Sequence, residues 1–266
     1  MPHEDIGTIG RDIGNAGRLG WAPLRAGVVW LRELVVIAGD AAGAVSSGVG
    51  CLTGIVDMDD LLKVMTALAV DRPVFHSEAD FQHAFACALQ RANPDARIRL
   101  ETRPARGEHL DVLFSEGDCQ VAIELKYLTA AWAGPAVGES FELLSHGAQD
   151  IRAYDCVKDI VRIERYTTAT PDSSGLVVVL ANDASYWRPV AHGRLTNADA
   201  FRIREGAVLH GDHGWGPNAG SGTMHGREAS LRLVGTYTCR WRDYSRLDGR
   251  NGLFRYLAFR VPPLEA

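Results

Sequence analysis

The sequence predicts an α/β protein in which helices flank a mixed central sheet, and three observations lead to this prediction. From residue 58 onward, segments with apolar residues at helical spacing alternate with short strand-like segments. Three of the strand-like segments follow one another with short turns, as in an antiparallel meander. A later run, LVVVLA at 176–181, is apolar at every position, which is typical of a buried central strand.

The bulk composition is that of an ordinary globular protein. Of its 266 residues, 46% are hydrophobic and 23% are charged, and the formal net charge is −5. This charge disfavours a protein that coats nucleic acid by bulk electrostatics, but it does not exclude an enzyme with a local basic cleft. The five cysteines are widely spaced and form no CxxC pair, which disfavours a zinc ribbon and fits a cytoplasmic protein.

Residues 1–57 are predicted to be a weakly organised N-terminal extension. They are rich in Gly, Ala and Val, and the spacing of apolar residues allows one helix at 23–37. The most apolar stretch, 26–45, is interrupted by three charged residues, so neither a signal peptide nor a membrane-spanning helix is expected. Both a genuine extension and an over-long start of the chain fit this composition.

A more regular domain is predicted at 58–266. It begins with a helix at 59–70, and Ser77 then caps a second helix that has Glu78 and Asp80 in its first turn. The order from Glu78 is helix, three strands, helix and strand (α-βββ-α-β), with further strands added at the C-terminus. The elements expected after the second helix are strands at 97–102, 110–114 and 120–127, a long loop at 129–145, a helix at 147–166, the buried strand at 176–181, a short helix near 197–205, a glycine-rich loop at 211–226, and strands at 231–241 and 254–261.

Two acids and a lysine come together on the predicted meander. Asp111 lies on its second strand, and Glu124 and Lys126 lie two residues apart on its third strand. Residues i and i+2 of a strand share a face, so Glu124 and Lys126 point one way while the apolar residues that alternate with them point into a core. If the second and third strands are hairpin neighbours, Asp111 approaches Glu124.

Two carboxylates beside a lysine are suited to the hydrolysis of a phosphodiester bond. Mg²⁺ prefers oxygen ligands and keeps bound waters when only a few carboxylates hold it. The ion lowers the pKa of a bound water and offsets charge on the phosphoryl oxygens. A lysine close by orients the attacking water and stabilises the developing negative charge. Glu78, at the start of its helix, offers a further carboxylate.

This set of residues resembles the PD-(D/E)xK nuclease superfamily. The resemblance covers 72–181 well and the C-terminal part only loosely, and the residue before Asp111 is a leucine where the family motif has proline. It implies a restriction-endonuclease-like core, with metal binding by Asp111 and Glu124, Lys126 at the catalytic water, and Glu78 as an auxiliary ligand. The metal that it implies is Mg²⁺, for which Mn²⁺ can substitute.

The resemblance also implies partners and a role. The substrate is expected to be nucleic acid, DNA rather than RNA, and the role defence or repair; no membrane is involved. In relatives, the helix after the ExK strand flanks the active site, which suggests that Gln149, Lys158 and Arg162 contact the substrate. Because the net charge is acidic, a protein partner or a homodimer is plausible. Sequence preference, endonuclease or exonuclease action, and oligomeric state are not encoded in any motif.

Alternatives to a nuclease site stay open for the same residues. Asp111, Glu124 and Lys126 can form an ion pair across a half-exposed sheet, and Glu78 can serve only the helix dipole. A catalytically silent copy of the fold would act as a nucleic-acid-binding or protein-interaction module. A hydrolase of small phosphate esters would use the same chemistry.

Two further groups of residues carry weaker hypotheses. The histidines of the glycine-rich region suggest a zinc site, although they lack partner cysteines. The aromatic and basic residues near the C-terminus suggest a surface that stacks on a nucleic acid strand, or else an amphipathic last sheet. The residues concerned are His210, His213 and His225 for the first group, and Tyr237, Arg240, Trp241, Arg242, Tyr244, Arg246, Arg250 and Arg255 for the second.

Overall fold

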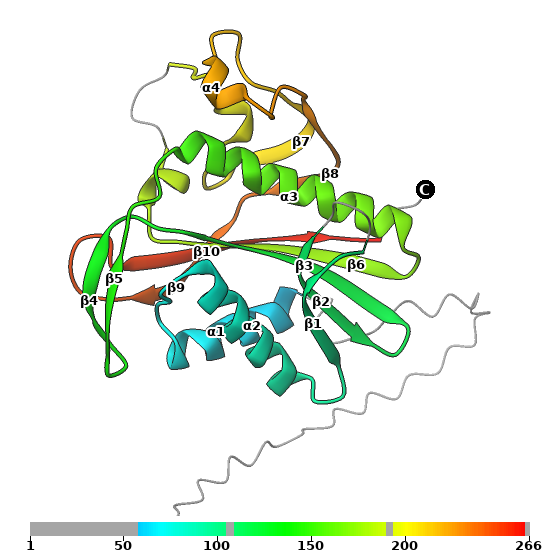
Figure 1. Cartoon of the computed structure of the whole chain (residues 1–266), viewed down its shortest axis with the longest axis vertical. Helices are drawn as coiled ribbons and strands as arrows, with labels where there is room; N and C mark the ends of the chain where they lie inside the picture. Colours follow the sequence, from blue (N-terminus) through cyan, green and yellow to red (C-terminus); the bar gives the residue numbers. More distant parts are fainter. Residues whose placement is uncertain (1–57, 105–108, 190–193, 264–266) are drawn as a thin grey trace, which may run out of the picture. The chain divides into compact units, whose positions relative to one another are not determined.

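A mixed sheet of six strands lies at the centre of the computed structural model, which describes residues 58–104, 109–189 and 194–263 (Figure 1). The extension and helix predicted within 1–57 lie outside the described residues. β3 and β6 are parallel neighbours, and every other pair of neighbours in this sheet is antiparallel. The strands, in their order across the sheet, are β1 (Arg97–Thr102), β2 (Leu110–Glu116), β3 (Cys119–Leu128), β6 (Ser173–Ala181), β10 (Leu253–Val261) and β9 (Trp241–Arg246).

Helices cover both faces of the sheet. α1 (Met58–Asp71) and α2 (Glu78–Ala92) pack on one face, and α3 (Gln149–Ala169) packs on the other (Figure 1). As predicted, the Ser77 hydroxyl caps α2 by accepting a hydrogen bond from the backbone N–H of Asp80. The prediction of an α/β protein with a mixed central sheet between helices is therefore confirmed.

The meander and the buried strand are also confirmed. β1 pairs with β2, and β2 pairs with β3, in antiparallel register. All nine residues of β6 are buried, because this strand lies between β3 and β10 and has helices over both of its faces. The connection from β3 to β6 runs through α3, which leaves α3 lying over the two strands that it joins.

The loop predicted at 129–145 is wrong, because it contains a β-hairpin. β4 (Trp132–Ala136) and β5 (Glu139–Leu143) pair across a turn at Val137 and Gly138, both of which have a positive φ. The side chains of Trp132, Phe141 and Leu143 are buried, so the hairpin has one apolar face. Its strands are short and contain a glycine and a proline, which weakens the strand signal in the sequence.

The C-terminal elements differ from the prediction in three places. The helix predicted near 197–205 is only a 3-10 turn at Asp199–Phe201, where the Asp199 carboxylate accepts hydrogen bonds from Thr196 and Arg202 and so fixes a turn instead. The strand predicted at 231–241 is interrupted before Trp241. Its first part is β8 (Leu231–Thr238), which pairs in a separate two-stranded sheet, and its last residue begins β9 of the main sheet.

The glycine-rich loop predicted at 211–226 is not wholly irregular. Its start belongs to β7 (Val208–His213), the partner of β8, and a short helix, α4 (Ser221–Met224), lies within it.

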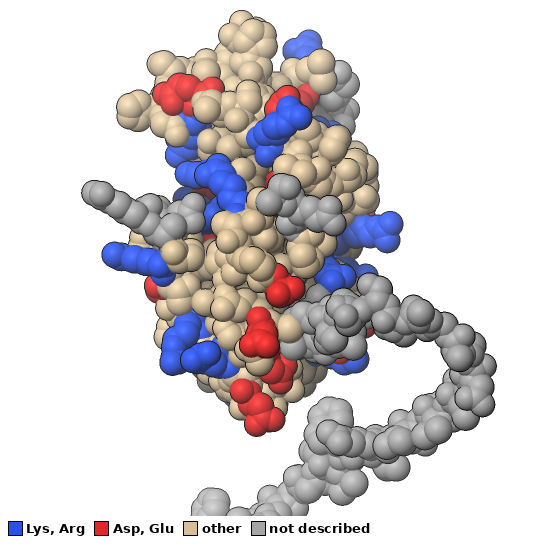
Figure 2. Space-filling view, turned by 90° about the vertical axis from the view of Figure 1, so that its right-hand side faces the viewer, with Lys and Arg blue, Asp and Glu red and all other residues tan. Residues whose placement is uncertain are grey.

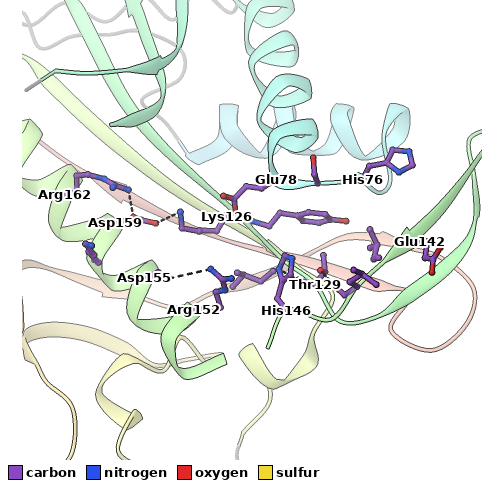
Figure 3. Close-up of a pocket in the computed structure, with 16 residues that line it drawn as sticks. His76, Glu78, Lys126, Thr129, Glu142, His146, Arg152, Asp155, Asp159 and Arg162 are labelled. Carbon is purple, nitrogen blue, oxygen red and sulfur yellow. Dashed lines mark hydrogen bonds and ion pairs between the residues drawn. The ribbon is translucent and has the colours of Figure 1, made fainter. Parts of the chain in front are cut away.

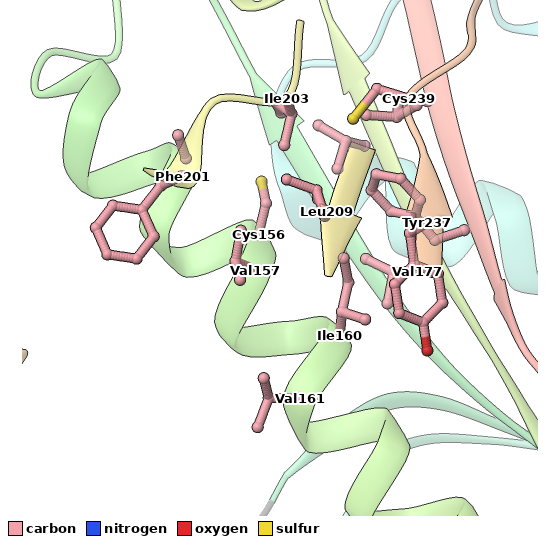
Figure 4. Close-up of a cluster of buried hydrophobic side chains, with 14 of the residues drawn as sticks. Cys156, Val157, Ile160, Val161, Val177, Phe201, Ile203, Leu209, Tyr237 and Cys239 are labelled. Atoms are coloured by element: carbon pink, nitrogen blue, oxygen red, sulfur yellow. The ribbon is translucent and has the colours of Figure 1, made fainter. Parts of the chain in front are cut away.

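The side of α3 that faces the sheet is apolar along most of its length. Val157 and Ile160 pack toward Val177 of β6, and Leu209 and Tyr237 of the β7–β8 hairpin close the same cluster (Figure 4). This packing fixes the position of α3 over β3. It therefore also fixes the few charged side chains that α3 directs at the sheet.

Candidate active site

The third strand divides its side chains between two environments. Val121, Ile123 and Leu125 belong to the core beneath α1 and α2. Glu124 and Lys126 alternate with them and so point to the opposite face, beneath α3. Asp111 alternates with Val112 in the same way, which brings it to the α3 face as well.

Asp111 and Glu78 lie where β2 and β3 separate. The last pair in the register of these strands is Val112 with Ile123, so the next N–H groups on that edge of β3 have no strand partner. The Asp111 carboxylate accepts a hydrogen bond of 2.7 Å from the backbone N–H of Leu125. The Glu78 carboxylate accepts one of 2.9 Å from the backbone N–H of Tyr127. Both acids are thus aligned along the edge of β3, next to Lys126.

Two charged residues of α3 complete a chain of buried ion pairs. Lys126 Nζ lies 3.0 Å from a carboxylate oxygen of Asp159, and Arg162 also pairs with Asp159 (Figure 3). The same Arg162 guanidinium lies 2.6 Å from Glu124 Oε2. Glu124 is 1% exposed and Asp159 is 3% exposed, so both carboxylates are shielded from water. Glu124, Arg162, Asp159 and Lys126 therefore form an open chain of alternating charge, which we call the ionic chain.

Burial and neighbouring acids shift the protonation of this group. Burial, together with the negative charges of Asp111 and Asp159, raises the pKa of Glu124 to about 9. Burial alone lowers the pKa of Lys126, but Asp159 and the other neighbouring acids outweigh it and raise that pKa. Burial raises the pKa of Asp159. Lys126 is therefore held as a cation, and Glu124 takes up a proton more readily than an exposed glutamate does.

A cleft of about 580 Å³ opens beside the ionic chain. Lys126, Asp159 and Arg162 line it together with Glu78, and Lys158 and Arg152 of α3 bring further positive charge (Figure 3). The opposite wall comes from the β4–β5 hairpin and the segment after it, which contribute Glu142, Leu143, Leu144 and His146. The hairpin that the sequence did not predict is therefore one wall of the candidate site.

The three residues proposed to contact substrate do not lie together. Lys158 and Arg162 both line the cleft. Gln149 lies instead beside a separate cavity of about 620 Å³, and its amide is 3.4 Å from Asp183. Gln149 is at the first turn of α3, whereas Arg162 is more than three turns further along, which accounts for the separation.

Asp159 is a site residue that the sequence pattern did not single out. Asp159 is one of the polar residues of α3, and nothing in the sequence distinguishes it from a solvated surface residue. The available signal was its spacing, because Asp159 and Arg162 at i and i+3 share a face and carry charges that complement Glu124 and Lys126 at i and i+2.

The carboxylates of the site are oxygen donors of the kind that a divalent cation prefers. Over the described residues, no three or more His, Cys, Asp or Glu side chains are arranged to hold a metal ion by themselves. Mg²⁺ does not require such a cage, because one or two carboxylates suffice when water and substrate oxygens complete the shell. Glu124 Oε1 is buried and has no hydrogen-bond partner within the described part of the chain. The residues present therefore fit a cation held by few protein ligands.

The histidines of the glycine-rich region do not assemble into a metal site among the described residues. The His213 ring is buried, and its Nδ1 lies in hydrogen-bonding contact with the carbonyl of Ala200. His210 is exposed, and its Nδ1 lies 3.1 Å from the carbonyl of Gly235. These contacts explain two of the three histidines without a metal.

The aromatic residues near the C-terminus are buried. Tyr237, Trp241 and Tyr244 are each less than a tenth exposed, so their rings are not a stacking surface. Arg242 and Arg246 of β9 are exposed beside them. This segment is the amphipathic part of a sheet, which was the second of the two interpretations of its sequence.

Comparisons with known proteins gave no match. No family model matches the chain, and neither a curated protein nor a solved structure was found to be similar. None of the helices in the described ranges is long and apolar enough to cross a membrane. The geometry and charge of the site are therefore the basis for a functional proposal.

Proposed function

We propose that the chain is a Mg²⁺-dependent nuclease with a restriction-endonuclease-like core of the PD-(D/E)xK type. The observation that carries the proposal is the convergence of Asp111, Glu124 and Lys126 on one face of the sheet, with Glu78 aligned on the same strand edge. The α-βββ-α-β order of elements around these residues supports the same proposal. Acids and a lysine in this arrangement suit phosphodiester hydrolysis.

The charge balance supports a divalent cation at this place. Four carboxylates, those of Glu78, Asp111, Glu124 and Asp159, surround two cationic side chains, Lys126 and Arg162. When all four acids are ionised, they carry two more charges than these two cations. Mg²⁺ or Mn²⁺ would supply positive charge to balance them, and Asp111 and Glu124 would hold it, with Glu78 as an auxiliary ligand.

The chain's own residues account for the other parts of the reaction. When bound, the ion supplies an acidified water and charge compensation for the phosphate. Lys126 stays protonated because of its acidic neighbours, so it can orient the attacking water and stabilise negative charge as the transition state forms. Lys158 and Arg162 provide positive charge along the cleft, where they would bind phosphates flanking the bond that is cleaved.

The proposed substrate is DNA, and the proposed setting is a cytoplasmic role in defence or repair. Four Lys and Arg side chains line the cleft, but four Asp and Glu side chains line it too, and the whole chain is acidic. Binding would therefore depend on a few contacts rather than on a broad basic surface. A protein partner or a second copy of the chain would extend the contact with the duplex.

A second candidate function has one observation in its favour. In the ionic chain, Arg162 already pairs with Glu124, and Asp159 already pairs with Lys126. A catalytically silent nucleic-acid-binding or protein-interaction module would use such pairs only to hold α3 on the sheet. The two candidates differ in whether the acids and the lysine are needed for cleavage.

Cleavage assays separate these candidates. Purified full-length chain would be incubated with plasmid DNA, labelled duplexes and labelled single strands, in Mg²⁺, in Mn²⁺, and in EDTA. We expect cleavage only with a divalent ion, and a loss of about 100-fold or more in Asp111→Asn and in Lys126→Met, because each removes a group that acts in the transition state.

Matched substitutions at exposed positions are the controls. Asp118→Asn, in the turn between β2 and β3, and Lys63→Met, on the surface of α1, should leave cleavage unchanged. Cleavage that persists in both Asp111→Asn and Lys126→Met would falsify the site assignment. Hydrolysis of a model phosphate ester without hydrolysis of DNA would point to a small-molecule hydrolase, and binding of DNA without cleavage would point to the silent module.

A further inference from the structure

The contact between Arg162 and Glu124 places a positive charge where the proposed cation would bind. We propose that Arg162 is an exchangeable counter-ion, which pairs with Glu124 in the cation-free site and gives up this carboxylate when a divalent cation binds. This inference rests on the proposed function. It adds that Arg162 regulates the binding of the divalent cation to the site.

The two oxygens of Glu124 have different surroundings. Oε2 lies 2.6 Å from Arg162 Nη2. Oε1 is buried and has no hydrogen-bond partner among the described residues. A buried carboxylate with one oxygen paired and the other unsatisfied is only partly stabilised. The pairing with Arg162 is therefore a contact that a more highly charged partner can replace.

A guanidinium and a divalent cation cannot both stay close to the same carboxylate at low cost. Both are positive, and their repulsion is strong in a buried site where water screens little. Glu124 is almost fully buried, so the pair cannot spread apart into solvent while both keep contact with it. Binding of the cation and pairing by Arg162 are thus in competition.

Arg162 has another position to occupy after it leaves Glu124. Its side chain is 26% exposed and lines the cleft. It also contacts Asp159, which lies on the same face of α3 three residues earlier, so its charge stays compensated without Glu124. Asp159 thus serves as the fixed partner and Glu124 as the exchangeable one.

The exchange couples loading of the cation to binding of substrate. A guanidinium released into the cleft can form two parallel hydrogen bonds to a phosphate. Since both events require Arg162 to leave Glu124, each favours the other. The site then binds the cation weakly by itself and more tightly when a phosphodiester is present.

Calorimetric titration of Mn²⁺ into the full-length chain tests the competition directly. The variants are Arg162→Gln, which removes the competing charge, and Arg165→Gln, which makes the same change at an exposed position of the same helix. We expect Arg162→Gln to bind Mn²⁺ at least about tenfold more tightly than the unchanged chain, because a positive charge next to the ion is gone. Arg165→Gln should bind within twofold of the unchanged chain.

A lysine at the same position gives a second measurement if the glutamine variant does not fold. Arg162→Lys keeps the charge, but a single ammonium on a shorter side chain cannot span both carboxylates as a guanidinium does. Its affinity for Mn²⁺ should rise by a smaller factor than in Arg162→Gln. Circular dichroism of each variant establishes that it is folded before titration.

The outcomes separate this inference from the proposed function. If the unchanged chain binds Mn²⁺ and cleaves DNA, but the folded Arg162 variants bind Mn²⁺ equally or more weakly, the exchange is wrong and the nuclease proposal stands. Weaker binding in particular would mean that Arg162 holds Glu124 in place for the ion. If no variant binds Mn²⁺ and none cleaves, both proposals are wrong.

Discussion

A few charged residues are buried, and these contribute more to the stability of the structure than exposed charged residues do. Glu124, Asp159 and Glu164 are each at most 3% exposed, yet each is surrounded differently. Glu124 and Asp159 face other charges in the ionic chain. Glu164, on the same helix as Asp159, accepts hydrogen bonds from neutral donors: the backbone N–H groups of Val234 and Gly235 and the hydroxyl of Tyr237. Its role is therefore to hold the β7–β8 hairpin against α3.

We expect Glu164→Ala to lower the free energy of unfolding by about 3 kcal/mol, because buried donors then lose a charged acceptor. Urea denaturation followed by fluorescence measures this change. Glu142→Ala, at an exposed position of β5, is the control and should cost less than about 0.5 kcal/mol. A loss for Glu164→Ala no larger than that of the control would contradict the assigned role.

At the scale of elements, the close approach of α3 to β6 depends on Gly175. An added Cβ at this position would overlap Cγ2 of Ile163, an atom that cannot swing aside because its side chain is branched at Cβ. Gly175 lies opposite Ala122 of β3, two residues before Glu124. The spacing between α3 and the sheet at Gly175 therefore also affects the distance from α3 to the candidate site.

Gly175→Ala should therefore destabilise the protein, by about 1–3 kcal/mol, through overpacking. A double-mutant cycle with Ile163→Ala tests the cause, because removing the overlapping atom should make the second substitution less costly. Gly147→Ala, where an added Cβ meets nothing within 4 Å, is the comparison and should have little effect. Additive effects of Gly175→Ala and Ile163→Ala would rule out the overlap as the cause.

The helices and strands also differ in how well the sequence alone predicts them. The helix at Glu78, the meander and β6 were predicted because each has strong local patterning: a capping serine, alternating strands or a uniformly apolar run. The β4–β5 hairpin was missed because its strands are short and its apolar face is recognised only once Trp132 packs near Phe254. The strand at 231–241 was predicted as one element because its division depends on which strand each half pairs with. Local signals predict elements, and non-local pairing decides their limits.

The same distinction applies to the candidate site. Glu124 and Lys126 share a face through the geometry of one strand, so the sequence was enough to group them. The partnership of Lys126 with Asp159 depends on how α3 crosses the sheet, which no spacing along the chain specifies. Gln149 was grouped with Lys158 and Arg162 because they share a helix, but the cleft faces only part of that helix.

At the scale of the whole molecule, the described residues show no broad basic surface on the face seen in Figure 2. The net charge of the chain is −5. On the face that Figure 2 shows, Lys and Arg side chains of the described residues are interspersed with Asp and Glu. The cations that line the cleft are few: Lys126, Arg152, Lys158 and Arg162. Binding of nucleic acid would thus release few counterions.

We therefore expect the affinity for a DNA duplex to depend only moderately on salt. A plot of log K against log salt should have a slope of about −2 to −4, since each neutralised phosphate contributes about −0.9. Fluorescence anisotropy from 50 to 200 mM KCl measures the slope, with Ca²⁺ in place of Mg²⁺ to prevent cleavage. Lys158→Gln should reduce its magnitude by about one. A slope steeper than about −6 would require a broad basic surface that the cleft does not supply.

The ionic chain has a consequence for synthesis of the protein on the ribosome. Glu124 and Lys126 leave the ribosome before Asp159 and Arg162, and much of the apolar surface on which α3 packs comes from β6 and later strands, which follow it in the chain. Non-local pairing, such as that of β6 with β3, is slow compared with the formation of a helix or a hairpin. We therefore expect the four charges to come together only in a chain that has completed β6. A nascent or truncated chain that ends before this strand lacks the assembled site, however well its helices have formed.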